Sequence, residues 1–153
     1  MEKHVKKSLE LFDNYNCCQS IIGVYGPLLG VDQNQVLLMT TGFGAGMAYQ
    51  GKTCGAVVGA YLCMGLIAGK ISSDNLARKE IAVQFIQEFN QKFIKQHLFL
   101  ECKELLGIDV SQSGNLELAR STGVFNKYCP KFVETSAQIV DEIIQHHHLN
   151  LTD

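Results

Sequence analysis

Apolar residues recur every three or four positions along almost the whole chain, and stretches in which apolar and polar residues alternate are absent. Spacing of three or four matches the turn of an α-helix, whereas alternation would match a β-strand. The pattern therefore predicts an all-α protein. A compact bundle of about six or seven helices would accommodate the segments that carry the pattern.

The length and composition fit a single helical domain that spans residues 1–153. Hydrophobic residues make up 46% of the chain and charged residues 18%, a balance typical of globular proteins and not of disordered ones. The formal net charge is -2 and the lysines are scattered, so we expect no nucleic acid as a partner.

The N-terminal sequence MEKHVKKSLELF interrupts its apolar residues with charges, unlike a secretory signal. We therefore expect a cytoplasmic location. Cytoplasmic thiols are kept reduced, so the six cysteines of the chain indicate metal binding or redox chemistry more than a permanent disulfide framework.

Residues 54–69 carry no charge and are rich in glycine. The segment is shorter than the roughly 20 apolar residues of a membrane span, so it predicts a buried central helix and no membrane span. Gly55, Gly59 and Cys63 share one face of this helix, which would let another backbone approach closely. We expect a homodimer or another close helix pair to use this face.

Other segments carry signals for where helices lie and where they begin. Residues 74–98 place Phe85 and Phe89 on one face of a long amphipathic helix. Asn16 is a predicted N-cap, and Pro130 predicts the start of the last helix because proline suits the first helical position. The glycine-rich segment 42–47 predicts a tight turn packed near the cysteines.

Four of the six cysteines fall where helices are predicted to begin. A helix N-terminus offers unpaired N–H groups and the positive end of the macrodipole, both of which favour a thiolate. A cysteine there can have its pKa lowered from about 8.5 to about 3.5–7.5, and the thiolate is both the nucleophile and the metal ligand. We therefore predict that these cysteines converge as one thiolate centre: Cys17, Cys54, Cys102 and Cys129.

The remaining two cysteines are predicted to be structural. Cys63 lies in the middle of an apolar helix, where a small buried hydrophobic residue is expected. Cys18 follows Cys17 directly and so points about 100 degrees away around the helix. Its position next to Cys17 leaves open whether Cys18 can substitute for that residue.

The same residues form a recognisable arrangement. Its parts are Asn16-Cys17 before an apolar helix, the glycine-rich segment 42–47, the motif CGAVVG at 54–59, CKELLG at 102–107, and Cys129-Pro130. Together these resemble the C_GCAxxG_C_C family, a group named for a proposed redox activity. The resemblance covers nearly the whole chain and implies four functional cysteines, at the same positions that the helix starts select. The chain departs from the family in carrying a second thiol, Cys18, where a small residue is usual.

Three functions agree with a four-cysteine centre. The first is an iron–sulfur cluster or other metal centre for electron transfer or sensing, because soft thiolates select iron–sulfur clusters, zinc and copper(I). The second is metal-free dithiol/disulfide exchange with a redox partner protein. The third is a structural zinc site closed by four ligands. The sequence shows no acid/base constellation, so whether the protein is an enzyme stays open.

Overall fold

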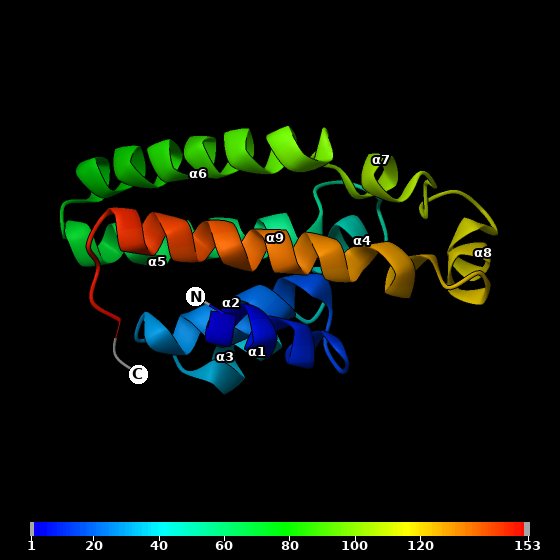
Figure 1. Cartoon of the computed structure of the whole chain (residues 1–153), viewed down its shortest axis with the longest axis horizontal. Coiled ribbons are helices and arrows are strands. Elements are labelled where there is room, and N and C mark those ends of the chain that lie inside the picture. The colour runs from blue at the N-terminus through cyan, green and yellow to red at the C-terminus, as the bar shows by residue number, and fades with distance from the viewer. Residues whose placement is uncertain (1, 152–153) are drawn as a thin grey trace.

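The computed structural model describes residues 2–151, which are arranged in helices joined by short connections (Figure 1). The all-α prediction is confirmed for this part of the chain, because it contains no strand and only one isolated bridge, between Thr53 and Glu101. In chain order the helical elements are α1 (Glu2–Phe12), α2 (Cys17–Leu28), α3 (Gln33–Met39), α4 (Gly44–Met47), α5 (Gly55–Ile71), α6 (Asn75–His97), α7 (Cys102–Leu106), α8 (Asn115–Ser121) and α9 (Val124–His146).

The number of helices is slightly larger than predicted. The short element α4 has left-handed backbone at Ala45 and Gly46, which leaves eight right-handed helices in residues 2–151 where six or seven were predicted. The short helices α7 and α8, with 5 and 7 residues, lie where the sequence predicts short helices at residues 102–106 and around 115–121. The error is therefore in the predicted total and not in a helix that the sequence failed to indicate.

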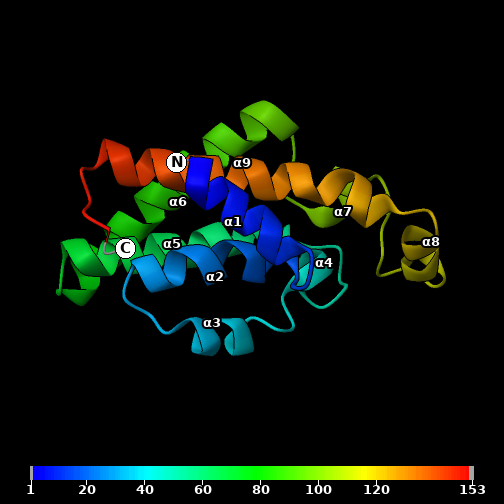
Figure 2. The same cartoon turned by 60° about the horizontal axis from the view of Figure 1, so that its bottom comes forward.

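The helices α2, α5 and α9 all begin at the same end of the bundle. Figures 1 and 2 show their N-terminal ends directed toward the end of the bundle that carries α4, α7 and α8, while α6 returns along the bundle in the opposite direction to α5. Residues at the starts of these helices are therefore close in space although they are far apart in sequence.

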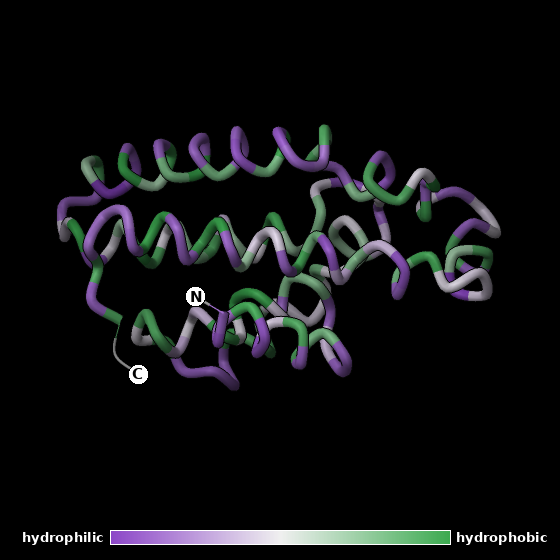
Figure 3. The backbone as a smooth tube through the Cα atoms, in the orientation of Figure 1, coloured by the Kyte–Doolittle hydropathy of each residue, from purple (hydrophilic) through white to green (hydrophobic). Residues whose placement is uncertain are grey.

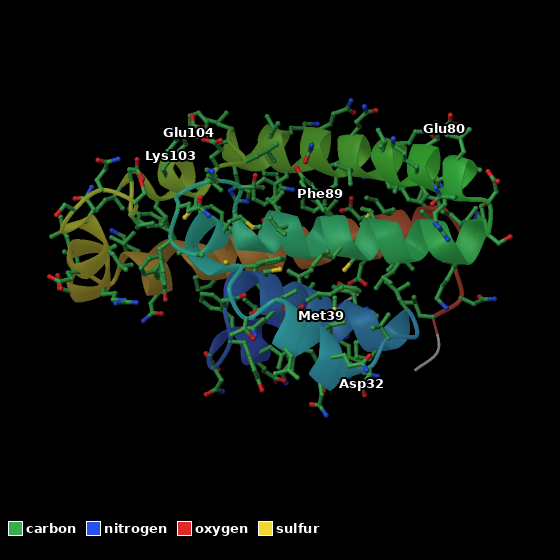
Figure 4. All side chains as sticks on the ribbon, turned by 180° about the vertical axis from the view of Figure 1, so that it is seen from behind. Asp32, Met39, Glu80, Phe89, Lys103 and Glu104 are labelled. Atoms are coloured by element: carbon green, nitrogen blue, oxygen red, sulfur yellow. The ribbon has the colours of Figure 1, made fainter. Side chains whose placement is uncertain are left out.

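The glycine-rich helix α5 lies in the centre of the bundle, as predicted, and packs against α2, α6 and α9. The tube of α6 changes repeatedly between hydrophilic and hydrophobic colours in Figure 3, as expected of a helix with one face in the core. Phe85, Phe89 and Phe93 form the buried face of α6. Figure 4 shows Phe89 pointing into the bundle and Glu80 on its outer surface.

Gly55 and Gly59 serve a helix pair within the chain. A Cβ atom at Gly59 would lie 2.8 Å from the carbonyl oxygen of Cys18 and 2.8 Å from the Cβ atom of Ile21, both on α2. A Cβ atom at Gly55 would collide with the sulfur of Cys17. The close contact that the glycines predict is therefore made between α2 and α5, and the homodimer stays a prediction.

Pro130 does not begin the last helix, so this prediction is wrong. Helix α9 begins at Val124, after Gly123 in left-handed conformation, and Pro130 lies in its second turn. Proline there lacks the N–H that would bond the carbonyl of Asn126. The helix continues because most of its later residues are buried in the core, and such packing supplies most of the stability of a helix in a protein.

None of the helices in residues 2–151 combines the length and the apolar sequence that a membrane crossing requires.

Candidate thiol site

The four predicted site cysteines reach one cavity from four different elements. Cys17 is the first residue of α2, Cys54 is the N-cap residue of α5, Cys102 is the first residue of α7, and Cys129 lies inside α9. All four line a single cavity of about 220 Å³. The predicted position at a helix start is therefore confirmed for three of them and wrong for Cys129, which reaches the cavity from the interior of a helix. The lowered pKa that a helix start predicts is found only at Cys17, because the pKa values of Cys54, Cys102 and Cys129 are raised.

Exposure separates these four cysteines from the other two. The cavity cysteines keep between 5% and 8% of their surface exposed, whereas Cys18 and Cys63 are at 0%. Burial raises the pKa of both Cys18 and Cys63, so neither is a thiolate at neutral pH. Cys18 and Cys63 are core residues, and in this structure Cys18 does not take the place of Cys17.

Cys17 lies among hydrogen-bond donors that stabilise its thiolate. The thiol of Cys54 donates a hydrogen bond to the Cys17 sulfur, and the backbone N–H groups of Ala45, Cys17 and Cys18 also hydrogen-bond it. Together they outweigh the effect of burial and lower the pKa of Cys17 to about 7. Cys17 is therefore the cavity cysteine that ionises most readily near neutral pH.

The pKa of Cys54 is shifted in the opposite direction. It is raised well above its ordinary value because its thiol donates to Cys17, because it is buried, and because the charge of the Cys17 thiolate opposes a second ionisation. Cys17 and Cys54 thus share one proton, which stays on Cys54 when Cys17 is a thiolate.

The other two cysteines of the cavity are held protonated. Burial and the charges of Cys17 and Asp109 raise the pKa of Cys102 to about 12. Burial and the charge of the Cys17 thiolate raise the pKa of Cys129 as well. The cavity therefore holds one ionisable thiol at neutral pH, surrounded by three thiols that remain neutral.

The donor from Ala45 depends on an unusual backbone segment. Five consecutive residues have positive φ: Ala45 (49°), Gly46 (71°), Met47 (67°), Ala48 (54°) and Tyr49 (61°). Left-handed helical backbone costs about 1–2 kcal/mol for each residue with a side chain, so it occurs mainly at isolated positions. Strain of this kind is found where the surrounding structure fixes a functional site. The glycine-rich sequence predicted a turn near the cysteines but gave no sign of left-handed alanine, methionine and tyrosine.

Gly46 makes this segment possible. A Cβ atom there would collide with the backbone nitrogen of Lys52 and would lie 2.8 Å from the Cβ atom of Cys102. The N–H of Lys52 donates a hydrogen bond of 3.1 Å to the carbonyl of Gly46. The glycine therefore lets the left-handed segment pack directly against the residue that carries the third thiol.

Asn16 fixes the start of α2 and joins it to the segment before α4. Its side-chain oxygen accepts a 2.9 Å hydrogen bond from the N–H of Gln19, which confirms the predicted N-cap. Its side-chain nitrogen donates to the carbonyls of Thr40 and Thr41, each at 3.1 Å. The residue before Cys17 thus holds both the helix start and the chain that leads to Ala45.

Backbone pairing brings Cys54 and Cys102 to the same place. The N–H of Cys54 donates to the carbonyl of Leu100 at 2.8 Å, and the N–H of Cys102 donates to the carbonyl of Lys52 at 2.6 Å. These bonds flank the isolated bridge between Thr53 and Glu101. No motif predicts this pairing, because it joins residues far apart in the sequence.

The rest of the cavity wall is mainly apolar, with one cationic residue. The apolar residues are Phe12, Leu105, Leu106, Phe125 and Phe132. Tyr49 and Arg120 also line the cavity, and both are exposed to solvent, so they lie where it opens. The sequence analysis did not single out either residue, since an isolated tyrosine and an isolated arginine carry no motif.

The arrangement of the cysteines does not by itself form a metal site. Within residues 2–151, no group of three or more His, Cys, Asp or Glu side chains is placed to hold a metal ion. The thiols line the same cavity, yet they are not gathered as ligands around one point.

The fold and the site define an all-helical protein with four cysteines around one small cavity. Residues 15–143 match the family described as "Putative redox-active protein (C_GCAxxG_C_C)", and the chain belongs to this family. The resemblance seen in the motifs is thereby confirmed. Comparisons with curated proteins and with solved structures give no match. The family description gives a redox role and names no metal, substrate or partner.

Proposed function

We propose that the protein carries out thiol–disulfide exchange, with Cys17 as the nucleophile and Cys54 as the resolving thiol. The observation that supports this most is that both cysteines line one cavity that opens to solvent, with the Cys17 sulfur packed against Gly55, the residue that follows Cys54. A disulfide between them would require the two sulfurs to approach to bonding distance. Gly55, which leaves room for the Cys17 sulfur beside α5, permits that approach.

The first step breaks the disulfide of the substrate. The Cys17 thiolate attacks one sulfur, a mixed disulfide forms between Cys17 and that half of the substrate, and the other half leaves as a thiolate. A thiolate with a pKa close to ambient pH is well suited to this attack, because it is both populated and nucleophilic.

In the second step Cys54 attacks the mixed disulfide at Cys17. When Cys17 is in a mixed disulfide it carries no charge, so the largest cause of the raised pKa of Cys54, its hydrogen bond to the Cys17 thiolate, is removed together with the charge of Cys17, while burial still opposes ionisation. Cys54 then gives its proton to the departing thiolate and attacks the Cys17 sulfur, which releases the second half of the substrate. The two cysteines lose two electrons and form a disulfide, and the substrate disulfide gains them as one thiol and one thiolate.

Counting thiols in matched variants tests this proposal. Reduced protein is treated with a small disulfide, and free thiols and disulfide-linked peptides are measured by mass spectrometry. We expect a bond between Cys17 and Cys54, its loss in Cys17→Ala, and its retention in the neighbouring variant Cys18→Ala, whose backbone N–H is kept. Bonds that form only between other cysteines, or none at all, would contradict the proposal.

A metal centre is the second candidate, because all four cysteines line the same cavity. An iron–sulfur cluster or a zinc ion would require these thiols to move closer together, since no three of the four cavity cysteines are placed to hold a metal. Protein purified without oxygen distinguishes the candidates. Visible absorbance with stoichiometric iron would replace the exchange proposal with a cluster, and stoichiometric zinc without absorbance would replace it with a structural site.

A further inference from the structure

Arg120 differs from the other residues around the cavity. Among the described residues that line it, Arg120 is the only one with a permanent charge. No carboxylate in residues 2–151 forms an ion pair with it. The side chain is exposed and yet lines the cavity, so a positive charge lies at its opening.

The guanidinium of Arg120 is held in place by Tyr49. Its Nη2 atom donates a 3.3 Å hydrogen bond to the Tyr49 hydroxyl, and its Cζ atom lies 5.3 Å from the centre of the tyrosine ring. A guanidinium has five N–H donors, so this contact leaves donors available for a ligand. An arginine already ordered on an aromatic ring loses little further freedom when it binds an anion.

The position of the Tyr49 ring is fixed by the backbone segment to which the residue belongs. Tyr49 is the last residue of the left-handed segment whose first residue, Ala45, donates to Cys17. One strained segment therefore fixes both the donor at the nucleophile and the aromatic ring that carries Arg120.

Resting on the proposed function, we infer that the site takes a small disulfide that bears a carboxylate, and that Arg120 is the residue that selects it. The carboxylate would bind the guanidinium at the opening, where bidentate hydrogen bonds are the usual mode of recognition. The apolar wall would hold the carbon atoms beside the disulfide while Cys17 attacks. A cavity of about 220 Å³ is smaller than the roughly 300–1,000 Å³ of sites for drug-sized ligands, so a small substrate fits it.

Three disulfides of similar length test the inference. Dithiodiglycolate carries two carboxylates, bis(2-hydroxyethyl) disulfide is neutral, and cystamine carries two ammonium groups. The rate at which each oxidises the reduced protein is divided by its rate with 2-mercaptoethanol, which removes differences in intrinsic reactivity. For the wild-type protein we expect this normalised rate to be about five to ten times higher for dithiodiglycolate than for the neutral compound, and lowest for cystamine.

Variants then assign the preference to Arg120. We expect Arg120→Gln to bring the ratio of the anionic to the neutral rate to about one, and Arg120→Lys to keep only part of it because lysine cannot form the bidentate contact. Lys127→Gln removes a positive charge that does not line the cavity and should keep the ratio. Because each ratio is taken within one variant, differences in the amount of active protein cancel, and circular dichroism confirms that each variant keeps its helical fold.

The outcomes separate this inference from the proposed function. An unchanged ratio in Arg120→Gln, with Cys17 and Cys54 still oxidised, would overturn the role of Arg120 and leave disulfide exchange in place. A failure of all three disulfides to oxidise Cys17 in the wild-type protein would overturn the exchange itself. Equal normalised rates for the three compounds in the wild-type protein would show that the site does not select an anion.

Discussion

Helices α2 and α5 contribute to two regions in which cysteine has different surroundings: the cavity, which other helices also line, and the sealed contact between α2 and α5. At the N-terminal ends, Cys17 and Cys54 meet beside a cavity and keep some exposure. One residue further along α2, Cys18 packs on the glycine face of α5 and is fully buried. Residue type is the same in both regions. The difference shows that position along one helix contact decides whether a thiol is reactive or structural.

The largest predicted effect is a change in stability when glycines of α5 are replaced, because Gly59 forms the sealed contact with α2. A Cβ atom at Gly59 would lie 2.8 Å from the carbonyl oxygen of Cys18, whereas one at Gly65 would meet nothing within 4 Å. We expect Gly59→Ala to lower the free energy of unfolding by about 2 kcal/mol through overpacking. Gly65→Ala should raise the free energy of unfolding by about 0.5–1 kcal/mol, because alanine is the better helix former.

Urea unfolding of reduced protein at neutral pH measures both glycine variants, and Gly65→Ala serves as the matched control within the same helix. Equal stability of the two variants would mean that α2 and α5 are not in close contact at Gly59. In that case the close contact between α2 and α5 could not explain why Cys18 is fully buried and Cys17 keeps some exposure.

A second prediction concerns the pH dependence of Cys17. Only the thiolate is alkylated, so the rate of alkylation at Cys17 should rise with pH and reach half its maximum near pH 7, the pKa of Cys17. Replacing Cys54 by alanine removes the main hydrogen bond to the thiolate. The midpoint of Cys54→Ala should therefore move upward, toward the value of about 8.5 that is usual for a cysteine.

Iodoacetamide labelling followed by peptide mass spectrometry gives the rate at each cysteine separately. Cys18→Ala is the control, and it should keep the midpoint because the backbone N–H of residue 18 is unchanged. Cys102, with a pKa of about 12, should remain unlabelled across the same pH range. A wild-type midpoint near 8.5 would mean that the cavity does not activate Cys17.

The smallest expected effect tests the strain in the left-handed segment. Ala48 has a φ of 54° and is exposed, and its N–H does not contact Cys17. Glycine adopts this conformation without the penalty, so Ala48→Gly should raise the free energy of unfolding by about 1 kcal/mol. Ala82→Gly, in the right-handed helix α6, should lower it by about the same amount. Chemical unfolding measures both, and a loss of stability in Ala48→Gly would contradict the assignment of strain to this segment.

Local patterns were enough to predict much of the fold. The helical spacing predicted the all-α class, Asn16 predicted the start of α2, and the uncharged sequence of residues 54–69 predicted the central helix. Each of these signals acts within a few residues, through a backbone hydrogen bond or the burial of one helix face. Pro130 shows the limit of such signals, because burial of α9 outweighs the local preference of proline for a helix start.

The sequence also determined which cysteines were candidates, since helix starts and the family motifs select the same four. The tertiary structure alone decided how they differ. Cys17 is acidic because Cys54 and Ala45, distant in sequence, place donors at its sulfur. Arg120 lies at the cavity because Tyr49 holds it there. A pKa depends on the charges and donors that surround a group in space, and those neighbours are fixed only when the helices have packed.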